Sequence, residues 1–328
     1  MKELIIKAND AEQRLDKFLK KYLCNAPLSM IYKTIRKDAK LNGRRVKEDT
    51  VIHEGDVLSL YVMDEELEAL SKKKTVRAKK QFTVIYEDDN ILAVDKPYGL
   101  LVHGDAVEKK DTLANQVIDY LIEKGDYVPR LEKSFTPSPA HRLDRNTTGI
   151  VLFGKSAEGL RSLTAALADR SGDEESGCGI HKIYTTVCFG KLDKEMHLRN
   201  KLIKDERANK GRVLPLSSPE GKYIETIARP VAYSDGLSLV EVELVTGRSH
   251  QIRAHMAFAG YPLLGDVKYC KASQTKISKE QYGVSTQLLH AGKLRFVKVG
   301  GAISYMNGRE ISAPLPQNFN TIVKNIFK

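Results

Sequence analysis

The chain has 328 residues, 41% of them hydrophobic and 29% charged, with a formal net charge of +11. This length and composition are typical of a globular protein with more than one domain, and they exclude a disordered chain. No apolar run approaches the roughly 18 residues of a membrane-spanning helix, and the basic excess favours a polyanionic partner such as nucleic acid over a membrane.

Residues 1–63 are predicted to form a small separate unit of two helices and short strands. In EQRLDKFLKKYL the apolar side chains recur at helical spacing. Ser29 is the expected N-cap of a second helix, MIYKTIRKD. Asn42-Gly43 then indicates a tight turn, and a strand is expected over 57–62.

Positive charge is concentrated in one part of this unit. Between residues 31 and 47 a single acid, Asp38, stands against the basic residues Lys33, Arg36, Lys37, Lys40, Arg44, Arg45 and Lys47. Each contact of such a side chain with a phosphate adds affinity through the release of counterions. A solvated helix face without a partner is the alternative, but the one-sided charge favours RNA or DNA.

The stretches RLDKFL, SMIYKTIRKDAKLNGRRV and EGDVL resemble the S-four type, or alpha-L, RNA-binding domain. The likeness covers most of residues 13–62 and implies a small α/β RNA-binding domain. It also implies that the second helix and the following hairpin grip structured RNA. The expected RNA-binding residues are Lys33, Arg36, Lys37, Arg44 and Arg45.

A charged linker is expected over residues 64–80, where acidic DEELEALS precedes KKKTVRAKK. Residues 81–328 have the pattern of a large α+β unit. Strands are predicted for FTVIYEDDNILAVDKP, IVLFGKS, HKIYTTVCFG, YIETIARPVAYS, LSLVEVELVTG and LLHAGKLRFV. Helices are predicted for DTLANQVIDYLIEKG, AEGLRSLTAALADR and SHQIRAHMAFAG. This order implies a mixed, largely antiparallel sheet with helices packed on it.

Four stretches of the large unit carry reactive side chains: VDKPYGLLVHG (94–104), HRLDRNTTG (141–149), HKIYTTV (181–187) and LVTGRSHQIRAH (244–255). By itself, a charged cluster such as HRLDRNTTG is often a solvated turn whose ion pairs contribute little. However, this cluster lies where a loop enters a strand, and such loops frequently hold functional groups.

Several common kinds of site are excluded. His250 and His255 are five residues apart, off a single helix face, so no catalytic metal is expected. Paired carboxylates, a Ser-His-Asp set and a phosphate-binding loop are also missing from the motifs. The cysteines form no C-x-x-C pair and fit free thiols in a reducing cytoplasm: Cys24, Cys178, Cys188 and Cys270.

In this order, DKPYGLLVHG, HRLDRNTTG, KIYTTVCFG and TGRSHQIRAH resemble the signature motifs of the RluA-type pseudouridine synthases. The domain in front makes the chain similar to the RluC-like branch. The family isomerises uridine in RNA: the N1–C1′ bond breaks, the base turns, and it rejoins the ribose through C5. The resemblance implies no cofactor and no metal, and it implies a uridine extruded from the folded RNA.

The resemblance also implies three catalytic residues. Asp144 is the carboxylate beside C1′, acting either as a nucleophile or as a base toward the ribose. Arg253 supplies the opposite charge that keeps this carboxylate ionised in a desolvated site. Tyr184 stacks on the extruded uracil, a contact worth roughly 1–3 kcal/mol, and assists removal of the C5 proton.

Other motif residues are expected to assist. Arg142 either helps to extrude the base or contacts phosphate only, and Arg145 contacts the RNA backbone. Supporting roles, in holding the motif loops or contacting RNA, fall to His141, Lys182, Arg248 and His250. NTTG and GRSHQIR replace the family's usual DTSG and GRTHQIR, but Thr148 and Ser249 keep a hydroxyl. Residues 171–180, SGDEESGCGI, are predicted to form a polar loop without an assigned role.

The expected function is therefore the isomerisation of specific uridines to pseudouridine in 23S, or large-subunit, ribosomal RNA. A tRNA pseudouridine synthase of the same family is one alternative. A non-catalytic RNA-binding factor for ribosome assembly is another, and the presence of both Asp144 and Arg253 counts against it. We expect a cytoplasmic monomer whose partner is RNA and which does not associate with membranes. The sequence does not identify the uridines.

Overall fold

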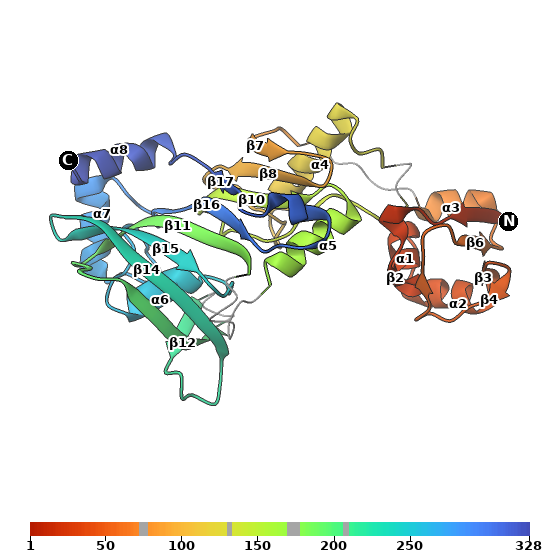
Figure 1. Ribbon diagram of the computed structural model, residues 1–328, viewed down its shortest axis with the longest axis horizontal. Helices are drawn as coiled ribbons and strands as arrows, with labels where there is room; N and C mark the ends of the chain where they lie inside the picture. Colours follow the sequence, from red (N-terminus) through yellow and green to blue (C-terminus); the bar gives the residue numbers. More distant parts are fainter. Residues whose placement is uncertain (72–77, 130–132, 169–177, 206–209) are drawn as a thin grey trace.

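The computed structural model describes residues 1–71, 78–129, 133–168, 178–205 and 210–328. They form two units, a small N-terminal one and a larger one built on a long sheet (Figure 1). The C-terminus lies at the far end of the larger unit, remote from the N-terminus. Most of the expected loop at 171–180, and residues 72–77 of the expected linker, lie outside the described residues.

The small unit contains a sheet in the order β1-β6-β3-β4 and a ribbon of β2 and β5. Its strands are β1 (Lys2–Ile5), β2 (Gln13–Arg14), β3 (Ala39–Leu41), β4 (Arg44–Arg45), β5 (Val51–Ile52) and β6 (Val57–Leu60). Its helices are η1 (Ala8–Asp10), α1 (Leu15–Tyr22), α2 (Leu28–Asp38) and α3 (Asp64–Ser71). The apolar residues spaced along α1 are buried, and Phe18 and Leu19 share one core with Ile31 and Ile35 of α2.

Two local predictions in this unit have different outcomes. The turn at Asn42 and Gly43 is confirmed: both residues have positive φ, 50° and 78°, and they connect β3 to β4. The N-cap at Ser29 is wrong, because α2 already begins at Leu28. Pro27 occupies the N-cap position in an extended conformation, and its carbonyl accepts the first helical N–H groups.

Helix α3 occupies the first half of the expected linker. Its Leu67 is 3% exposed and belongs to the core of the small unit. The carbonyl of Leu70 accepts the backbone N–H of Asn25 at 3.0 Å, which ties the helix to the end of α1. The small unit therefore continues through Ser71 in the structure, and the linker expected over 64–80 begins as a packed helix.

The large unit contains a sheet in the order β13-β12-β14-β15-β11-β16-β10-β8-β7, with β17 beside β16 and β9 beside β10. Its first strands are β7 (Thr83–Glu87), β8 (Ile91–Lys96), β9 (Ser138–Pro139), β10 (Thr148–Gly154), β11 (Gly179–Phe189) and β12 (Met196–Asp205). The later ones are β13 (Lys210–Leu214), β14 (Lys222–Ser234), β15 (Leu237–Leu244), β16 (Leu289–Val297) and β17 (Glu310–Ser312).

The helices of this unit are α4 (Leu113–Lys124), α5 (Ala157–Ala166), α6 (Gln251–Phe258), α7 (Ala272–Tyr282), η2 (Gly301–Met306) and α8 (Gln317–Ile326). The strand pairs named above are antiparallel except for β10 and β16, which run parallel. The mixed, largely antiparallel sheet confirms the predicted α+β class. Within the described ranges, no helix is both long and apolar enough to cross a bilayer.

The parallel pairing brings the motif at 141–149 against a strand from the end of the chain. Gly149 lies opposite Ala291, and its φ is +111°. A Cβ at this position would lie 2.7 Å from both the backbone nitrogen and the carbonyl carbon of Ala291. The glycine that ends HRLDRNTTG is therefore required by the close approach of β10 and β16.

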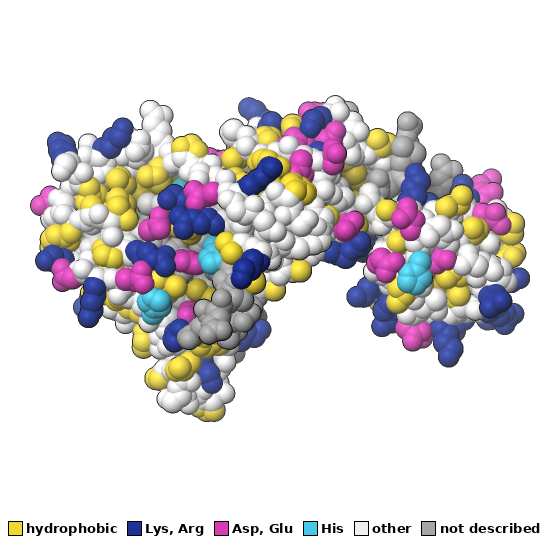
Figure 2. Space-filling model, viewed as in Figure 1, with side chains coloured by type: hydrophobic (Ala, Val, Ile, Leu, Met, Phe, Trp, Pro, Cys, Tyr) yellow, Lys and Arg dark blue, Asp and Glu magenta, His cyan; other side chains and the backbone are white. Residues whose placement is uncertain are grey.

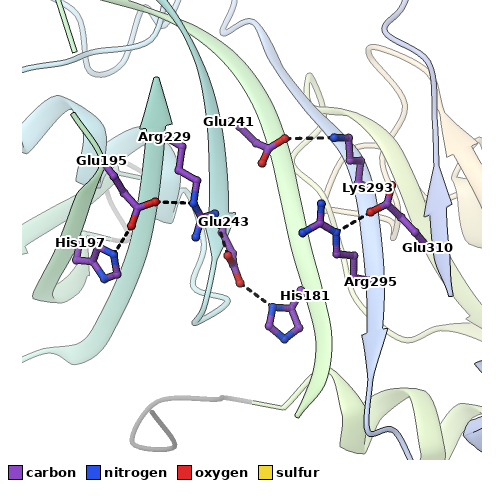
Figure 3. A network of polar contacts seen from close by, with 9 residues as sticks. All are labelled: His181, Glu195, His197, Arg229, Glu241, Glu243, Lys293, Arg295 and Glu310. Carbon is purple, nitrogen blue, oxygen red and sulfur yellow. Dashed lines mark hydrogen bonds and ion pairs between the residues drawn. The ribbon is translucent and has the colours of Figure 1, made fainter. Parts of the chain in front are cut away.

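One face of the sheet carries a ladder of charged side chains (Figure 3). Glu243 and Lys293 both lie opposite Ile183, so they share a face that alternates with that of Tyr184. Polar contacts of 2.6–3.3 Å join His197–Glu195, Glu195–Arg229, Arg229–Glu243, Glu243–His181, Lys293–Glu241 and Arg295–Glu310. Because acids and bases alternate, their charges largely neutralise one another on this face.

The two units meet at η1. Asp10 is 1% exposed, and its Oδ1 accepts the backbone N–H of Ser134 at 2.9 Å and the Ser134 hydroxyl at 2.7 Å. Asn9 accepts the backbone N–H of Ala157, the first residue of α5, at 3.1 Å. Buried polar contacts of this kind fix the small unit on the edge of the large one.

Candidate active site

A cavity of about 650 Å³ lies between β11, the start of α6 and the loop that precedes β10. This volume is in the range of small-ligand sites. Residues from three of the four motif stretches line it, although they are far apart in the sequence. The predicted site residues on its wall are His141, Arg142, Asp144, Lys182, Tyr184, Arg248, His250 and Arg253.

Asp144 lies in the loop between β9 and β10, and its side chain is 26% exposed. Its backbone carbonyl accepts the N–H of Thr147 at 3.1 Å, which closes a turn. Its carboxylate Oδ2 accepts a hydrogen bond from Nη1 of Arg253 at 3.2 Å, across 109 residues of sequence. The structure therefore brings together the acid and the guanidinium that the motifs suggested.

Arg253 is 5% exposed on α6 and contacts a second acid. Its Nε and Nη2 donate to the two oxygens of Asp266 at 2.7 and 2.8 Å. Burial by itself opposes the charged form, but the carboxylates of Asp266 and Asp144 raise the pKa of Arg253 above its ordinary value. The guanidinium is thus a fixed cation that serves two carboxylates.

Tyr184 lies on β11 and is 5% exposed. Burial, and secondly the negative charge of Asp144, raise the pKa of Tyr184 well above its ordinary value. The phenol therefore keeps its proton at neutral pH and is a hydrogen-bond donor there. Lys182, two residues earlier on the strand, lines the same cavity and is 7% exposed.

His250 is the N-cap of α6 and has a left-handed conformation, with φ 55° and ψ 19°. This conformation is uncommon for a residue other than glycine. Its Nε2 lies 3.7 Å from Oδ2 of Asp144, and its Nδ1 lies 3.3 Å from the hydroxyl of Tyr269. Burial lowers the pKa of His250, although the charge of Asp144 opposes this effect. The imidazole is therefore neutral at neutral pH.

Two other motif residues are built into the scaffold. Nε2 of His141 accepts the backbone N–H of Leu152 at 3.1 Å, and burial lowers the pKa of His141 to about 3. The hydroxyl of Thr148 lies 2.8 Å from Nδ1 of His290, whose Nε2 lies 3.2 Å from the carbonyl of Ala313. The hydroxyl that NTTG shares with DTSG thus connects β10 to β16.

The remaining predicted RNA-binding residues are exposed. Arg142 is exposed at the cavity rim. Arg145 is exposed, is not among the residues that line the cavity, and pairs with Asp105 at 3.0 Å. The basic residues predicted to bind RNA from the small unit are all exposed on α2, on β4 or next to them: Lys33, Arg36, Lys37, Arg44 and Arg45. Figure 2 shows basic side chains crowded along the edge of this unit.

Sequence reasoning missed two residues beside the site. Lys96 is completely buried, and its ammonium donates to the carbonyls of Pro97, Leu100 and Arg145, each at 2.9 Å. Asp266 is also completely buried. In the sequence, Lys96 is marked only by the proline that follows it, and Asp266 only by the glycine that precedes it. Within the described residues, no group of three or more His, Cys, Asp or Glu side chains is arranged to hold a metal.

Comparisons with known proteins identify the family of this chain. The family model described as RNA pseudouridylate synthase matches residues 90–258. The ribosomal large subunit pseudouridine synthase C of Escherichia coli (strain K12) is 31% identical over 92% of this chain and 90% of its own length. The protein of the same name from Vibrio vulnificus (strain CMCP6) is 29% identical over 96% of this chain and 93% of its own length.

Solved structures share the fold. The human RNA pseudouridylate synthase domain containing 4 has a TM-score of 0.54 at 20% identity, over 74% of this chain and 91% of that one. The human RNA pseudouridylate synthase domain containing 1 has a TM-score of 0.50 at 17% identity, over 75% and 94%. At these identities the likeness concerns the fold alone. Because the family model matches about half of the chain and relatives match nearly all of it, the chain belongs to the RNA pseudouridylate synthase family.

Proposed function

We propose that this protein isomerises specific uridines to pseudouridine in 23S ribosomal RNA and that Asp144 is its catalytic carboxylate. The relatives that match this chain over nine-tenths of their length are named for the large ribosomal subunit. The observation that carries the proposal is the contact of 3.2 Å between Asp144 and Arg253 at the wall of the cavity of about 650 Å³.

The reaction places clear demands on these residues. The N1–C1′ bond of uridine breaks, and a bond between C5 and C1′ forms. The proton on C5 leaves, and N1 gains a proton, so that the product is an isomer of the substrate. A carboxylate at the wall of the cavity either adds to C1′ or removes a proton from the ribose, and both roles need it ionised. Arg253 stabilises this ionised form of Asp144.

Tyr184 serves the base rather than the ribose. Its ring lies on the cavity wall, where it stacks on the uracil. In the free protein the hydroxyl of Tyr184 keeps its proton and is a hydrogen-bond donor. It assists removal of the C5 proton only after the bound base has changed the surroundings of the phenol. Arg142, at the rim, contacts the RNA on the path by which the uridine leaves its stack.

The small unit gives this enzyme its grip on a large folded RNA. Exposed basic residues on α2 and the β3–β4 hairpin supply phosphate contacts that do not depend on sequence. The joint between Asp10 and Ser134 sets the position of this basic face relative to the cavity. We take the protein to act as a monomer in the cytoplasm.

The decisive experiment maps pseudouridine by carbodiimide primer extension in ribosomal RNA and tRNA from cells that lack the protein. We expect stops at specific 23S positions to disappear and to return with the wild type but not with Asp144→Asn. Asp111→Asn, a change of an exposed acid elsewhere in the large unit, is the matched control and should restore them.

Other outcomes are equally clear. Full rescue by Asp144→Asn would overturn the catalytic assignment. Loss of stops only in tRNA would replace the proposed substrate with the tRNA alternative. No lost stop in either RNA, together with a defect in ribosome assembly, would favour the non-catalytic factor.

A further inference from the structure

We infer that Asp266 and Tyr269 are positioning residues that fix the orientation of Arg253 and so leave Asp144 with one oxygen free to react. This inference rests on the proposed role of Asp144. Both residues belong to the segment that follows α6, outside the four motif stretches. They contact the guanidinium from two directions, one at its edge and one at its face.

Asp266 binds the edge of the guanidinium. It accepts hydrogen bonds from Nε and Nη2 of Arg253, at 2.7 and 2.8 Å, in a buried bidentate pair. Only Nη1 then faces Asp144, and it donates to Oδ2 at 3.2 Å. Among the described contacts of Arg253 there is none to Oδ1 of Asp144. Without Asp266, the guanidinium would be able to turn and bind both oxygens of Asp144, which would hold the carboxylate away from the ribose.

The backbone around Asp266 is itself constrained. Gly265 has a φ of +81°, and a Cβ there would lie 2.8 Å from the carbonyl carbon of Thr286. The N–H of Lys268 donates to Oδ1 of Asp266 at 3.1 Å. The hydrogen bond from Lys268 and the close packing at Gly265 thus hold the carboxylate of Asp266 beside Arg253.

Tyr269 covers the face of the guanidinium. Its ring centroid lies 5.4 Å from Cζ of Arg253, within the range of a cation–π contact. Its hydroxyl accepts the N–H of Gly211 on β13 at 2.7 Å and lies 3.3 Å from Nδ1 of His250. The hydroxyl proton is thus available to His250, whose Nε2 faces Asp144. One tyrosine therefore connects β13, α6 and the site.

A geometric role of this kind affects the rate of the chemical step more than the binding of RNA. Misplacing a reacting group by about 1 Å costs roughly 100-fold in rate. We therefore expect Asp266→Asn to lower the single-turnover rate constant by about 10- to 100-fold at saturating enzyme. The dissociation constant of Asp266→Asn for RNA should stay within about twofold, because Asp266 is completely buried.

The experiment uses full-length protein and an unmodified transcript of 23S ribosomal RNA. It compares the wild type with Asp266→Asn, Asp266→Glu, Tyr269→Leu and Asp144→Asn. The matched control is Glu243→Gln. Glu243 is 9% exposed and accepts a hydrogen bond from Arg229 at 3.0 Å, but it lies on the opposite face of the sheet. Melting temperature, RNA affinity and single-turnover rate are measured for each variant.

We expect Asp266→Asn to lose rate with unchanged affinity, and Asp266→Glu to recover part of it because the charge is retained. Tyr269→Leu should lose about fivefold or more. Glu243→Gln should lose stability without losing rate. The inference is overturned if folded Asp266→Asn reacts within twofold of the wild type, or if rate follows melting temperature in all variants. Should Asp266→Asn fail to fold, a wild-type rate for Tyr269→Leu overturns it instead.

The same assay separates this inference from the proposed function. An active Asp144→Asn would refute the catalytic role of Asp144 itself. An inactive Asp144→Asn beside a fully active Asp266→Asn would refute only the positioning role.

Discussion

Lys96 shows how a single side chain holds two loops around the site. Its ammonium has three N–H donors, and each reaches a carbonyl oxygen at 2.9 Å. Two of the carbonyls belong to the turn after β8, and the third belongs to Arg145, the residue after the proposed catalytic acid. Burial lowers the pKa of Lys96 to about 7. In the protonated form all three of its donors are used, and the bond to the carbonyl of Leu100 is buried.

Lys96→Met is expected to lower the free energy of unfolding by about 2–3 kcal/mol, because it leaves buried carbonyls without a donor. Urea denaturation of the wild type and the variant measures this difference. Lys110→Met, at an exposed position before α4, should change stability by less than about 0.5 kcal/mol. Equal effects for the two variants would contradict the role given to Lys96.

The buried histidines make the fold sensitive to acid. His255 is completely buried, with Thr226 and Asn200 each 3.0 Å from a ring nitrogen, and burial lowers the pKa of His255 to about 4. Between pH 6.5 and about 4 the unfolded chain takes up a proton at this ring that the folded chain refuses. Stability therefore falls as the pH falls through this window.

This linkage predicts a loss of about 1.4 kcal/mol per pH unit for each such histidine within the window. Chemical denaturation at pH 7, 6 and 5 should show a shallower loss in His255→Asn than in the wild type. His53 provides the opposite case, since its hydrogen bond to Glu12 raises the pKa of His53. His53→Asn should make the loss of stability in acid steeper, because it removes a group whose protonation favours the folded state. Parallel curves for the wild type and His255→Asn would exclude the effect.

At the scale of elements, the parallel contact of β10 with β16 determines where the loop that carries Asp144 ends. The contact is close because Gly149 has no side chain and adopts a φ that other residues avoid. The same strands are joined by the hydrogen bond between Thr148 and His290 at 2.8 Å. Loop and sheet are therefore fixed together at one point.

Gly149→Ala should destabilise the protein by about 3 kcal/mol or more, since it adds both steric overlap and backbone strain. Gly99→Ala is the matched control: its φ is +80°, but a Cβ there meets no atom within 4 Å. It should cost about 1 kcal/mol from strain alone. Thermal unfolding of both variants separates the cost of steric overlap from the cost of backbone strain. Equal losses of stability would mean that the close approach to Ala291 is unimportant.

Sequence patterns predicted most elements and missed those whose burial is shallow. The apolar spacing in α1 and α4 and the apolar run in β10 gave correct helices and a correct strand. Strand β12 was missed because only Leu202 among its residues is buried, so its alternation is weak. Helix α7 buries only Ser278 and was missed for the same reason. Helix α3 was hidden by its acidic residues, although its Leu67 supplies a core side chain.

The site residues also divide into those that the sequence motifs predicted and those that only the structure reveals. Asp144, Tyr184 and Arg253 stand in motifs that a reader of the sequence can recognise, and the structure brings them to one cavity. Asp266 and Lys96 received no role from the sequence, although Lys96 stands in the stretch 94–104, because their contacts with Arg253 and Arg145 depend on the fold. Arg145 was expected to contact RNA, and in the structure it pairs with Asp105. Contacts between residues far apart in the sequence follow from the order of the strands in the sheet, and sequence patterns did not predict that order.

At the scale of the whole molecule, charge is distributed unevenly. The small unit presents exposed basic residues on α2 and β4, whereas the charged ladder on the large sheet neutralises itself. A polyanion is therefore attracted to the basic residues of the small unit and not to the face of the large sheet that carries Glu243 and Lys293. The contact between Asp10 and Ser134 fixes the position of this basic face relative to the cavity.

This distribution predicts the salt dependence of binding. Replacing Lys33, Arg36, Arg44 and Arg45 with glutamine should reduce the slope of log affinity against log salt by about 3, at roughly 0.7–0.9 per phosphate contact. Filter binding to a 23S transcript at several salt concentrations measures it. Replacing four exposed lysines at the far end of the large unit, Lys276, Lys279, Lys324 and Lys328, removes the same charge and should leave the slope nearly unchanged. Equal reductions would assign the effect to net charge alone.

The long separation between Asp144 and Arg253 has a consequence for synthesis. During translation the acid leaves the ribosome 109 residues before its guanidinium, and strand β16, which closes the sheet beside β10, follows later still. A nascent chain that stops short of these segments carries the acid without its cation and has a gap in the middle of its sheet. On the proposed roles of Asp144 and Arg253, we therefore expect such a truncated product to be inactive.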